Sequence, residues 1–403
     1  MPVEQSYFRK GFGLKDAIEG ALTADYHSRV VDVIRGHGHT LTVDSLTFRL
    51  AREFGFCYGV DRAVEYAYET RTKFPDRRTF LVGEIIHNPH VNSKLRAMGV
   101  EFLFRAGGGE FDFGGVTPAD VVILPAFGVT VRDFTRLRDI GCVLVDTTCG
   151  SVLNVWKRVD AYSRDGYTAV IHGKFFHEET KATASQVTNH PGGQYLIVRD
   201  MDEAREVCRY IEGAGDRDQL LSRFSHSVSA GFDPERDLKK IGVANQTTML
   251  SNESLAIAAE LRDSMARRWG EVALADHFRT FDTICSATQD RQDAVLKLIE
   301  EPLDLMVVIG GYNSSNTTHL AAICAERVAT YHIEDARCVD PDSGGIRFLP
   351  VGRREEISRD TWLPPGPVTI GITAGASTPN NKIGETLERI VAMRGGSLAP
   401  LLG

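Results

Sequence analysis

Residues 303–319 read LDLMVVIGGYNSSNTTH, a short apolar run that ends abruptly in small and polar residues. An unbroken apolar run of this length is typical of a strand that is buried on both faces of a sheet. The serine, asparagine and threonine residues that follow it are typical of the beginning of a helix. The stretch therefore predicts a strand, a tight turn and a helix, which is half of the unit that builds parallel sheets.

The same order of elements recurs along the chain. It is found at TFLVGEIIHNP (79–89), ADVVILPAFGVT (119–130), YTAVIHGKFFHEET (167–180) and GPVTIGITAGAST (366–378). Short strands that alternate with helices predict βαβ units and mostly parallel sheets, so the expected fold class is α/β. Ligands of such folds bind beyond the carboxyl ends of the strands. The polar residues at these ends are candidates for a site by position: His87, His177, Ser314, Asn316 and Ser377.

The composition narrows the class of protein. The chain has 403 residues, which is enough for two or three domains. Its net charge of −8 argues against a general nucleic-acid binder or a protein that binds anionic membranes. No apolar segment approaches the roughly 20 residues that span a bilayer, and the N-terminus has no apolar region of a secretory signal. We expect a cytoplasmic protein.

Two segments differ from this strand-and-helix pattern. Residues 14–35 have a helical pattern and predict one N-terminal helix ahead of the first strand. GGGEFDFGG (107–115) is rich in glycine, but it precedes a strand instead of following one. A phosphate-binding loop follows a strand, so this segment is expected to be a turn.

Three of the seven cysteines share one local context. They occur in FGFCYGVDRAVEYAYE (54–69), DTTCGSVLNVWKRVDAY (146–162) and DTICSATQDRQDAVLKLIE (282–300). In each segment the cysteine follows a short apolar run and precedes a helical pattern, as in a degenerate threefold repeat. The odd count and wide spacing of the cysteines argue against a disulfide framework. Cys57, Cys149 and Cys285 are therefore candidates for a chemical role.

That role follows from the position at a helix start. The partial positive charge of a helix N-terminus stabilises a thiolate. Three converging thiolates would bind a soft metal or an iron–sulfur cluster, and three ligands would leave one iron of a [4Fe–4S] cluster open. The alternative is that cysteine packs as a small apolar residue. We keep that alternative for the remaining cysteines, which are Cys142, Cys208, Cys324 and Cys338.

Several polar segments predict an anionic ligand. GYNSSNTTH (311–319) offers hydroxyl and amide donors at the start of a helix, which is a natural phosphate site. GAST (375–378) is a smaller version, and NQTTMLSNES (245–254) adds Thr247 and Thr248. Any one of them is explained equally well as a helix cap or a turn. The absence of a Walker lysine and of GxGxxG argues against a nucleoside triphosphate or a dinucleotide.

HGKFFHEETKAT (172–183) has several interpretations. His177 could donate a hydrogen bond to a phosphate oxygen, and Glu179 could act as an acid. Equally well, His177 could be a structural histidine and Glu179 a solvated surface charge. A zinc-dependent hydrolase would use His172, His177 and a glutamate. Zinc sites of that kind place two histidines four residues apart on one helix face, whereas this segment follows a strand. A non-catalytic anion-binding or redox-sensing protein that keeps the cluster is the remaining alternative.

Taken together, these motifs resemble the 4-hydroxy-3-methylbut-2-enyl diphosphate reductase family, also called LytB. The matching segments are FGFCYGV, GEIIHNPHV, DTTC, HGKFFHEET, NQTTMLS, DTICSAT, RQDAV, YNSSNTTHL and GITAGAST. They follow the family's order from about residue 46 to residue 380, and the set is highly specific. The N-terminal extension resembles the longer forms of cyanobacteria and plants.

The resemblance implies a fold of three similar α/β units with mostly parallel sheets, arranged as a trefoil around a central iron–sulfur cluster. The implied division is an N-terminal extension (1–45), three α/β units (46–149, 150–283 and 284–377) and a C-terminal tail (378–403).

The resemblance also implies the reaction and its residues. The reaction is the reductive dehydroxylation of (E)-4-hydroxy-3-methylbut-2-enyl diphosphate, an allylic diphosphate, to isopentenyl and dimethylallyl diphosphate. It is the last step of the methylerythritol phosphate route to isoprenoids. One [4Fe–4S] cluster per chain would be ligated by Cys57, Cys149 and Cys285. The diphosphate would be held by His87, His177, Ser314, Asn316 and Ser377, with Ser315 adjacent.

Glu179 would deliver protons, with the help of Thr247 or Thr248. Reduced ferredoxin or flavodoxin would be the electron donor. The chain departs from the family's common pattern at Phe127, where many members have a histidine that contacts the diphosphate, and at Gly150, where a proline is usual. One diphosphate contact is therefore in doubt, and a looser helix start is expected after Cys149.

Overall fold

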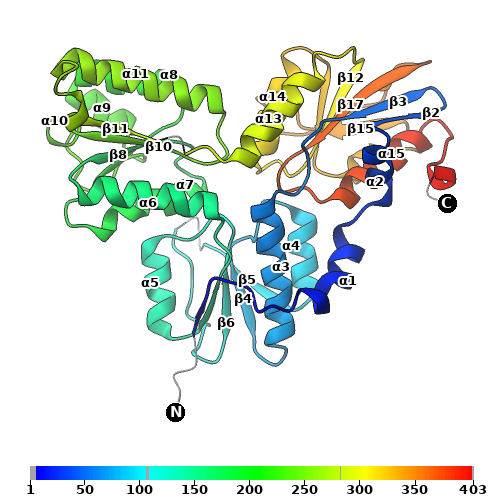
Figure 1. The fold of residues 1–403 in the computed structure, drawn as a ribbon, viewed down its shortest axis with the longest axis horizontal. Coiled ribbons are helices and arrows are strands. Elements are labelled where there is room, and N and C mark those ends of the chain that lie inside the picture. The colour runs from blue at the N-terminus through cyan, green and yellow to red at the C-terminus, as the bar shows by residue number, and fades with distance from the viewer. Residues whose placement is uncertain (1–5, 106–108, 282, 402–403) are drawn as a thin grey trace. The chain divides into compact units, whose positions relative to one another are not determined.

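The computed structural model describes residues 6–105, 109–281 and 283–401. The chain divides into two compact units, and each unit is built from three separate segments of the chain. Figure 1 shows the ribbon coloured along the sequence. The first unit comprises Met1–Lys10, Asp76–Gly83 and Glu101–Cys285, and the second comprises Gly11–Pro75, Glu84–Val100 and Ser286–Gly403. Parts of the predicted glycine-rich turn (107–108), the first residue of DTIC (282) and the outer ends of the predicted extension and tail lie outside the described residues.

The first unit holds a five-stranded sheet in the order β1-β7-β6-β4-β5. Its strands are β1 (Tyr7–Phe8), β4 (Thr79–Val82), β5 (Val100–Leu103), β6 (Val121–Leu124) and β7 (Val143–Asp146). β6 pairs in parallel with both β4 and β7, and all four of its residues are buried. Helix α5 (Val131–Ile140) begins where the Thr130 hydroxyl accepts a hydrogen bond from the Asp133 N–H, and it packs Leu137 against the sheet.

A second, four-stranded sheet of the first unit has the order β11-β10-β8-β9, with all pairs parallel. Its strands are β8 (Thr168–His172), β9 (Tyr195–Val198), β10 (Ile241–Asn245) and β11 (Phe278–Thr280). Its principal helices are α6 (Gly150–Arg164), α7 (Glu178–Ala184), α8 (Met201–Ile211) and α11 (Ser251–Trp269). α6 packs with Ala169 and Ile171 in one core cluster, whereas α8 and α11 lie side by side over the cluster that contains Val170 (Figure 1). Short segments complete this part: η2 (Ser185–Asn189), α9 (Arg217–Arg223), α10 (Pro234–Asp237) and α12 (Leu274–His277).

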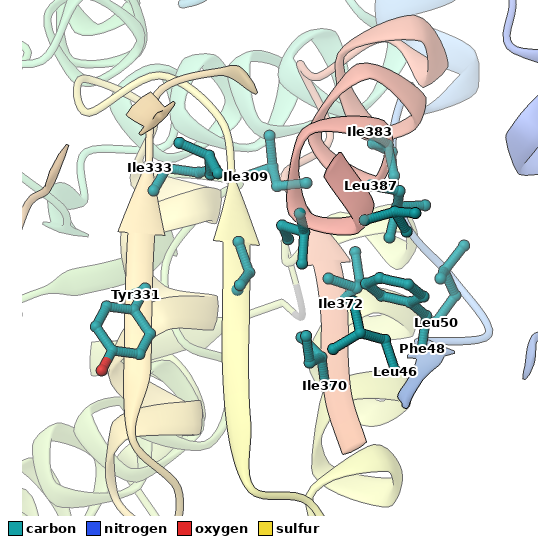
Figure 2. Packing of buried hydrophobic residues seen from close by; sticks show 14 of the residues in the cluster. Leu46, Phe48, Leu50, Ile309, Tyr331, Ile333, Ile370, Ile372, Ile383 and Leu387 are labelled. Carbon is teal, nitrogen blue, oxygen red and sulfur yellow. The ribbon is translucent and has the colours of Figure 1, made fainter. Parts of the chain in front are cut away.

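The main sheet of the second unit has five strands in the order β13-β12-β17-β3-β2. Its strands are β2 (Thr40–Val43), β3 (Leu46–Leu50), β12 (Leu305–Ile309), β13 (Thr330–Ile333) and β17 (Val368–Ala374). β2 pairs with β3 in an antiparallel hairpin, and the other pairs are parallel. Figure 2 shows the core on one face, where Ile383 and Leu387 of helix α15 (Asn380–Ala392) lie against Phe48 and Ile372. Helices α13 (Ser286–Leu298) and α14 (Ser315–Ala325) pack with Met306 and Val308 in a separate cluster. Each of the two core clusters of this sheet therefore contains residues from helices.

The other elements of the second unit are shorter or peripheral. They are α1 (Lys15–Tyr26), α2 (Arg29–Gly36), α3 (Tyr58–Lys73), α4 (Pro89–Ala97), η3 (Ala336–Cys338), η4 (Ala399–Leu401) and a small antiparallel sheet of β14 (Val339–Asp340), β15 (Gly345–Phe348) and β16 (Ile357–Arg359).

The predicted single helix over residues 14–35 is wrong, because the segment forms two helices, α1 and α2. Ser28 separates them in an extended conformation, and its hydroxyl accepts a hydrogen bond from the Val31 N–H. A serine that caps a helix start competes with a continuous helix. Gly384 supports the break, since a Cβ at that position would collide with the Ser28 hydroxyl.

The remaining expectations about the fold class are confirmed. Each of the five apolar runs is a strand, and each is followed by a helix. The structure is α/β with mostly parallel sheets. Within the predicted glycine-rich segment, Gly114 and Gly115 form a turn ahead of β6. No helix in the described part of the chain is long and apolar enough to cross a membrane. The domain boundaries inferred from the sequence stay a prediction.

Candidate active site

Each of the three singled-out cysteines stands at the start of a helix. Cys57 is the N-cap of α3 in the second unit, and Cys149 is the N-cap of α6 in the first unit. Cys285 directly precedes Ser286, the first residue of α13. Gly150, in the position of the family's usual proline, is the first residue of α6. The prediction that these three cysteines lie at helix starts is therefore confirmed.

The seven cysteines, all of which lie in the described residues, form no disulfide and fall into two classes. Cys57, Cys149 and Cys285 are partly exposed, and the other four are buried. Burial raises the pKa of the Cys142 and Cys208 thiols to about 11 and that of Cys324 to about 12. Those three thiols resist ionisation, whereas a ligand set needs accessible thiolates. The donor chemistry of the partly exposed three fits an iron–sulfur cluster.

In neither unit do three or more described His, Cys, Asp or Glu side chains already form a group that could hold a metal ion. Cys149 and Cys285 belong to the first unit and Cys57 to the second. The zinc alternative needs His172 and His177 in one such group. The structure instead buries His172, with its Nδ1 2.8 Å from the Ser254 hydroxyl. His172 is thereby a structural residue.

Cys285 is in direct contact with two segments of the first unit. Its backbone N–H donates to the Thr247 carbonyl over 3.4 Å. Its sulfur accepts a hydrogen bond from the Ser151 hydroxyl at 3.3 Å. Ser151 is the second residue of α6, two positions after Cys149. Both contacts come from residues of the first unit.

Glu179 lies in the same neighbourhood. It is 3% exposed, and its Oε1 accepts the Thr247 backbone N–H at 2.5 Å. Thr247 therefore contacts Glu179 through its N–H and Cys285 through its carbonyl. Thr248 is held by Gln246, whose amide donates to the Thr248 hydroxyl at 2.7 Å. The structure thus brings three of the predicted residues, Glu179, Thr247 and Cys285, into one contact chain.

His177 is the N-cap of α7, and its Nδ1 accepts the Glu179 N–H at 3.2 Å. The Phe127 ring meets the His177 ring edge to face, with centroids 6.4 Å apart. Phe127 thereby packs against the neighbouring histidine instead of offering a hydrogen-bond donor. The orientation of His177 is set from two sides, by a hydrogen bond and by this aromatic contact.

A second group of predicted residues is gathered in the second unit. Ser314 is the N-cap of α14, where its hydroxyl accepts the Thr317 N–H at 3.3 Å. The Asn316 Oδ1 accepts the Ala376 N–H at 2.9 Å, which ties this helix start to the loop after β17. Ser377 in that loop donates to the His87 carbonyl at 3.4 Å. The loop before α14, the loop after β17 and the loop that carries His87 therefore meet. Together with the buried Ser315 at the start of α14, they contain the five residues predicted for this unit.

The buried amide of Asn316 is the clearest sign of a ligand in this group. Asn316 is 2% exposed, and its Nδ2 has no hydrogen-bond partner among the described residues. A buried donor without a partner is costly. Since it lies at the positive end of α14, next to the hydroxyl groups of Ser314 and Ser315, it suits an anion.

Two residues that contribute to these groups are not assigned a role by any sequence motif. One is Ser151. The other is Arg291 of α13, which is 4% exposed and donates to the carbonyls of Gly55 and Phe56. Arg291 thereby holds the loop that leads into Cys57. Its presence in the RQDAV motif was the available clue, but the motif carried no indication of its partner.

The fold and these two groups define an α/β protein with thiols at helix starts and a candidate anion site after parallel strands. Residues 48–391 match the family model described as LytB protein. The chain belongs to the LytB family.

The relatives of the chain agree. It is 48% identical over 391 residues to the 4-hydroxy-3-methylbut-2-enyl diphosphate reductase of Thermosynechococcus vestitus, a match that covers 97% of this chain and 95% of that protein. It is 49% identical over 396 residues to the protein of the same name from Gloeobacter violaceus, covering 97% and 93%.

Two solved structures are also similar. One is described as (E)-4-hydroxy-3-methyl-but-2-enyl diphosphate reductase, the terminal enzyme of the non-mevalonate pathway. It has a TM-score of 0.52 and 27% identity, and the match covers 87% of this chain and 99% of that one. The reductase structure from Plasmodium falciparum has a TM-score of 0.61, covers 86% and 87%, and is 21% identical, so it supports the fold alone.

Proposed function

We propose that the chain is a 4-hydroxy-3-methylbut-2-enyl diphosphate reductase that converts the allylic diphosphate to isopentenyl and dimethylallyl diphosphate. The observation that carries the proposal is the contact chain from Glu179 through Thr247 to Cys285, in a member of the LytB family. It places a buried carboxyl group, which could donate a proton, near a thiol that is a candidate ligand of an electron-transferring cluster. The reaction consumes two electrons and two protons, breaks one carbon–oxygen bond and releases water.

Cys57, Cys149 and Cys285 would hold one [4Fe–4S] cluster. When bound, a cluster with one open iron supplies electrons one at a time and a Lewis acid for the substrate's hydroxyl group. The residues contribute accessible thiols at three helix starts, which the other four cysteines cannot do because they are buried.

Glu179 would be the proton donor. An alcohol leaves as water only if its oxygen receives a proton, and a positioned carboxyl group does this efficiently. The Thr247 N–H donates to one oxygen of Glu179 and thereby holds the carboxyl group in place. Thr247 and Thr248 would relay or orient the proton.

The diphosphate would bind to Ser314, Ser315, Asn316, Ser377 and His87, and to His177 of the first unit. Hydroxyl, amide and imidazole donors together with a helix N-terminus suit an anion of this charge. The unpartnered Asn316 Nδ2 would gain a phosphate oxygen as its acceptor. Phe127 offers no such donor, so the site has one hydrogen bond fewer than a site with histidine there.

The electrons would come from an external one-electron carrier, a reduced ferredoxin or flavodoxin, in the cytoplasm. The decisive experiment is anaerobic turnover of the reconstituted protein with the allylic diphosphate and a low-potential reductant. Formation of the two five-carbon diphosphates is the expected result. A protein that holds the cluster but yields no product would instead be the non-catalytic redox sensor.

A further inference from the structure

The Ser151 side chain donates a hydrogen bond to the sulfur of a candidate ligand. Its hydroxyl lies 3.3 Å from the Cys285 sulfur. It is also two residues after Cys149 on the same helix, so it connects the segments that carry two of the three thiols. A serine in the first turn of a helix most often serves the helix itself, as a cap. The N-cap of α6 is Cys149, and Ser151 has this different partner.

We propose that Ser151 is a positioning residue that donates a hydrogen bond to the Cys285 sulfur and raises the reduction potential of the cluster. The proposal rests on the proposed function, because it requires Cys285 to be a ligand. Hydrogen bonds to ligand sulfurs are among the factors that set the potentials of iron–sulfur clusters. Partners of this kind also fix the orientation of the ligand.

The charges beside Ser151 act in the same direction. A hollow of about 440 Å³ is lined by Ser151, Asn154, Lys157, Arg158, Thr283 and Ile284. Lys157 and Arg158 are exposed cations that line this hollow together with Ser151, and the Arg158 guanidinium carbon lies 3.7 Å from the centre of the Phe281 ring. Thr283 and Ile284 lead directly to Cys285. The Cys285 sulfur therefore accepts a hydrogen bond from Ser151 of α6, and the same helix carries the cations Lys157 and Arg158.

The direction of the effect follows from electrostatics. One-electron reduction adds negative charge to the cluster and its sulfur ligands. A hydrogen-bond donor stabilises the more negative state more strongly than the less negative one. Removal of the hydroxyl should therefore favour the oxidised state and shift the potential to a more negative value.

The test compares the wild type with Ser151→Ala, Ser151→Thr and Ser163→Ala. Ser151→Thr keeps the hydroxyl group. Ser163 is near the other end of α6, and its hydroxyl donates to the Val187 carbonyl at 2.9 Å, so its loss controls for weakening of the helix. Each protein is reconstituted anaerobically, its iron content is determined, and its midpoint potential is measured by potentiometry with an electron paramagnetic resonance readout.

The expected result is a potential for Ser151→Ala that is more negative by about 30–60 mV. This corresponds to a threefold to tenfold change in the reduction equilibrium at 59 mV per tenfold change for one electron. Ser151→Thr and Ser163→Ala should keep the wild-type potential. Loss of the cluster from Ser151→Ala but not from Ser151→Thr would also support the positioning role.

An unchanged potential and iron content in Ser151→Ala would overturn this inference and leave the proposed function intact. Loss of the cluster from both Ser151 variants would overturn it too, because the hydroxyl could not then be the cause. A wild-type protein that binds no cluster would instead overturn the proposed function, and this inference with it.

Discussion

Replacing Glu179 by glutamine separates the chemistry of the carboxyl group from its structural contact. The Glu179 Oε1 accepts the Thr247 N–H, and a glutamine side-chain oxygen can do the same. The fold and the iron content should therefore be unchanged. The amide cannot deliver a proton, and loss of general acid catalysis typically costs 10²–10⁴-fold in rate. At 1.36 kcal/mol per tenfold change, this is about 2.7–5.4 kcal/mol of transition-state stabilisation.

The assay is anaerobic turnover of the reconstituted protein, followed by the oxidation of a low-potential reductant and by product analysis. We expect kcat and kcat/KM to fall together, because proton donation acts only in the transition state. Glu178→Gln is the matched control. Glu178 is the adjacent residue, but it forms ion pairs with Arg105 at 2.8 Å and Lys181 at 3.0 Å, so the control should retain nearly full turnover.

Retention of more than about a third of wild-type turnover by Glu179→Gln would refute the assignment, because the expected loss is at least about a hundredfold. Glu179→Ala is a useful contrast for the structural contact. It leaves the buried Thr247 N–H without its acceptor, which should lower the free energy of unfolding by about 1–3 kcal/mol.

Three further predictions concern the second unit. Arg291→Met should lower the free energy of unfolding by about 1–3 kcal/mol, since it leaves the Gly55 carbonyl without its donors; denaturant unfolding would measure this, and an unchanged midpoint would contradict it. Asn316→Asp keeps the acceptor for the Ala376 N–H but places negative charge beside the diphosphate, so KM should rise at least about tenfold, which is about 1.4 kcal/mol; an unchanged KM would exclude Asn316 from the binding site. Burial lowers the pKa of His332 to about 4. As the pH decreases, the imidazole of His332 is therefore protonated in the unfolded chain before it is protonated in the folded chain. The free energy of unfolding should fall by up to about 1.4 kcal/mol per pH unit between about pH 6.5 and pH 4. His332→Gln should lose that part of the pH dependence in urea unfolding at pH 7 and pH 5, and an identical difference between the two pH values would contradict the interpretation.

The local elements could be predicted because each rests on a contiguous pattern. LDLMVVIGG forms β12 and SNTTH opens α14, as the change from apolar to polar residues requires. The same holds for the thiols at helix starts. The break at Ser28 cannot be predicted from the local pattern, because the helical pattern continues on both sides of it and the competing cap depends on the room left by Gly384.

Contacts between distant segments could not be read from the sequence. Arg291 reaches a carbonyl 236 residues away, and nothing in either segment specifies the other. Likewise, β3 lies beside β17 only because the chain returns to that sheet after more than three hundred residues. The hydrogen bond from Ser151 to Cys285 depends on the register of α6 relative to the loop before α13. Such pairings are determined by tertiary packing, and the local propensities of the residues do not predict them.

The central claim is that Cys57, Cys149 and Cys285 ligate one [4Fe–4S] cluster, and iron and sulfide analysis tests it most directly. Anaerobically reconstituted wild-type protein should be brown and contain about four irons per chain. Serine substitution of any of the three cysteines should remove most of the iron. Cys324→Ser, at a buried position, should leave the iron content unchanged if the protein folds. A colourless, iron-free wild type, or full iron content in the variant lacking all three cysteines, would contradict the account.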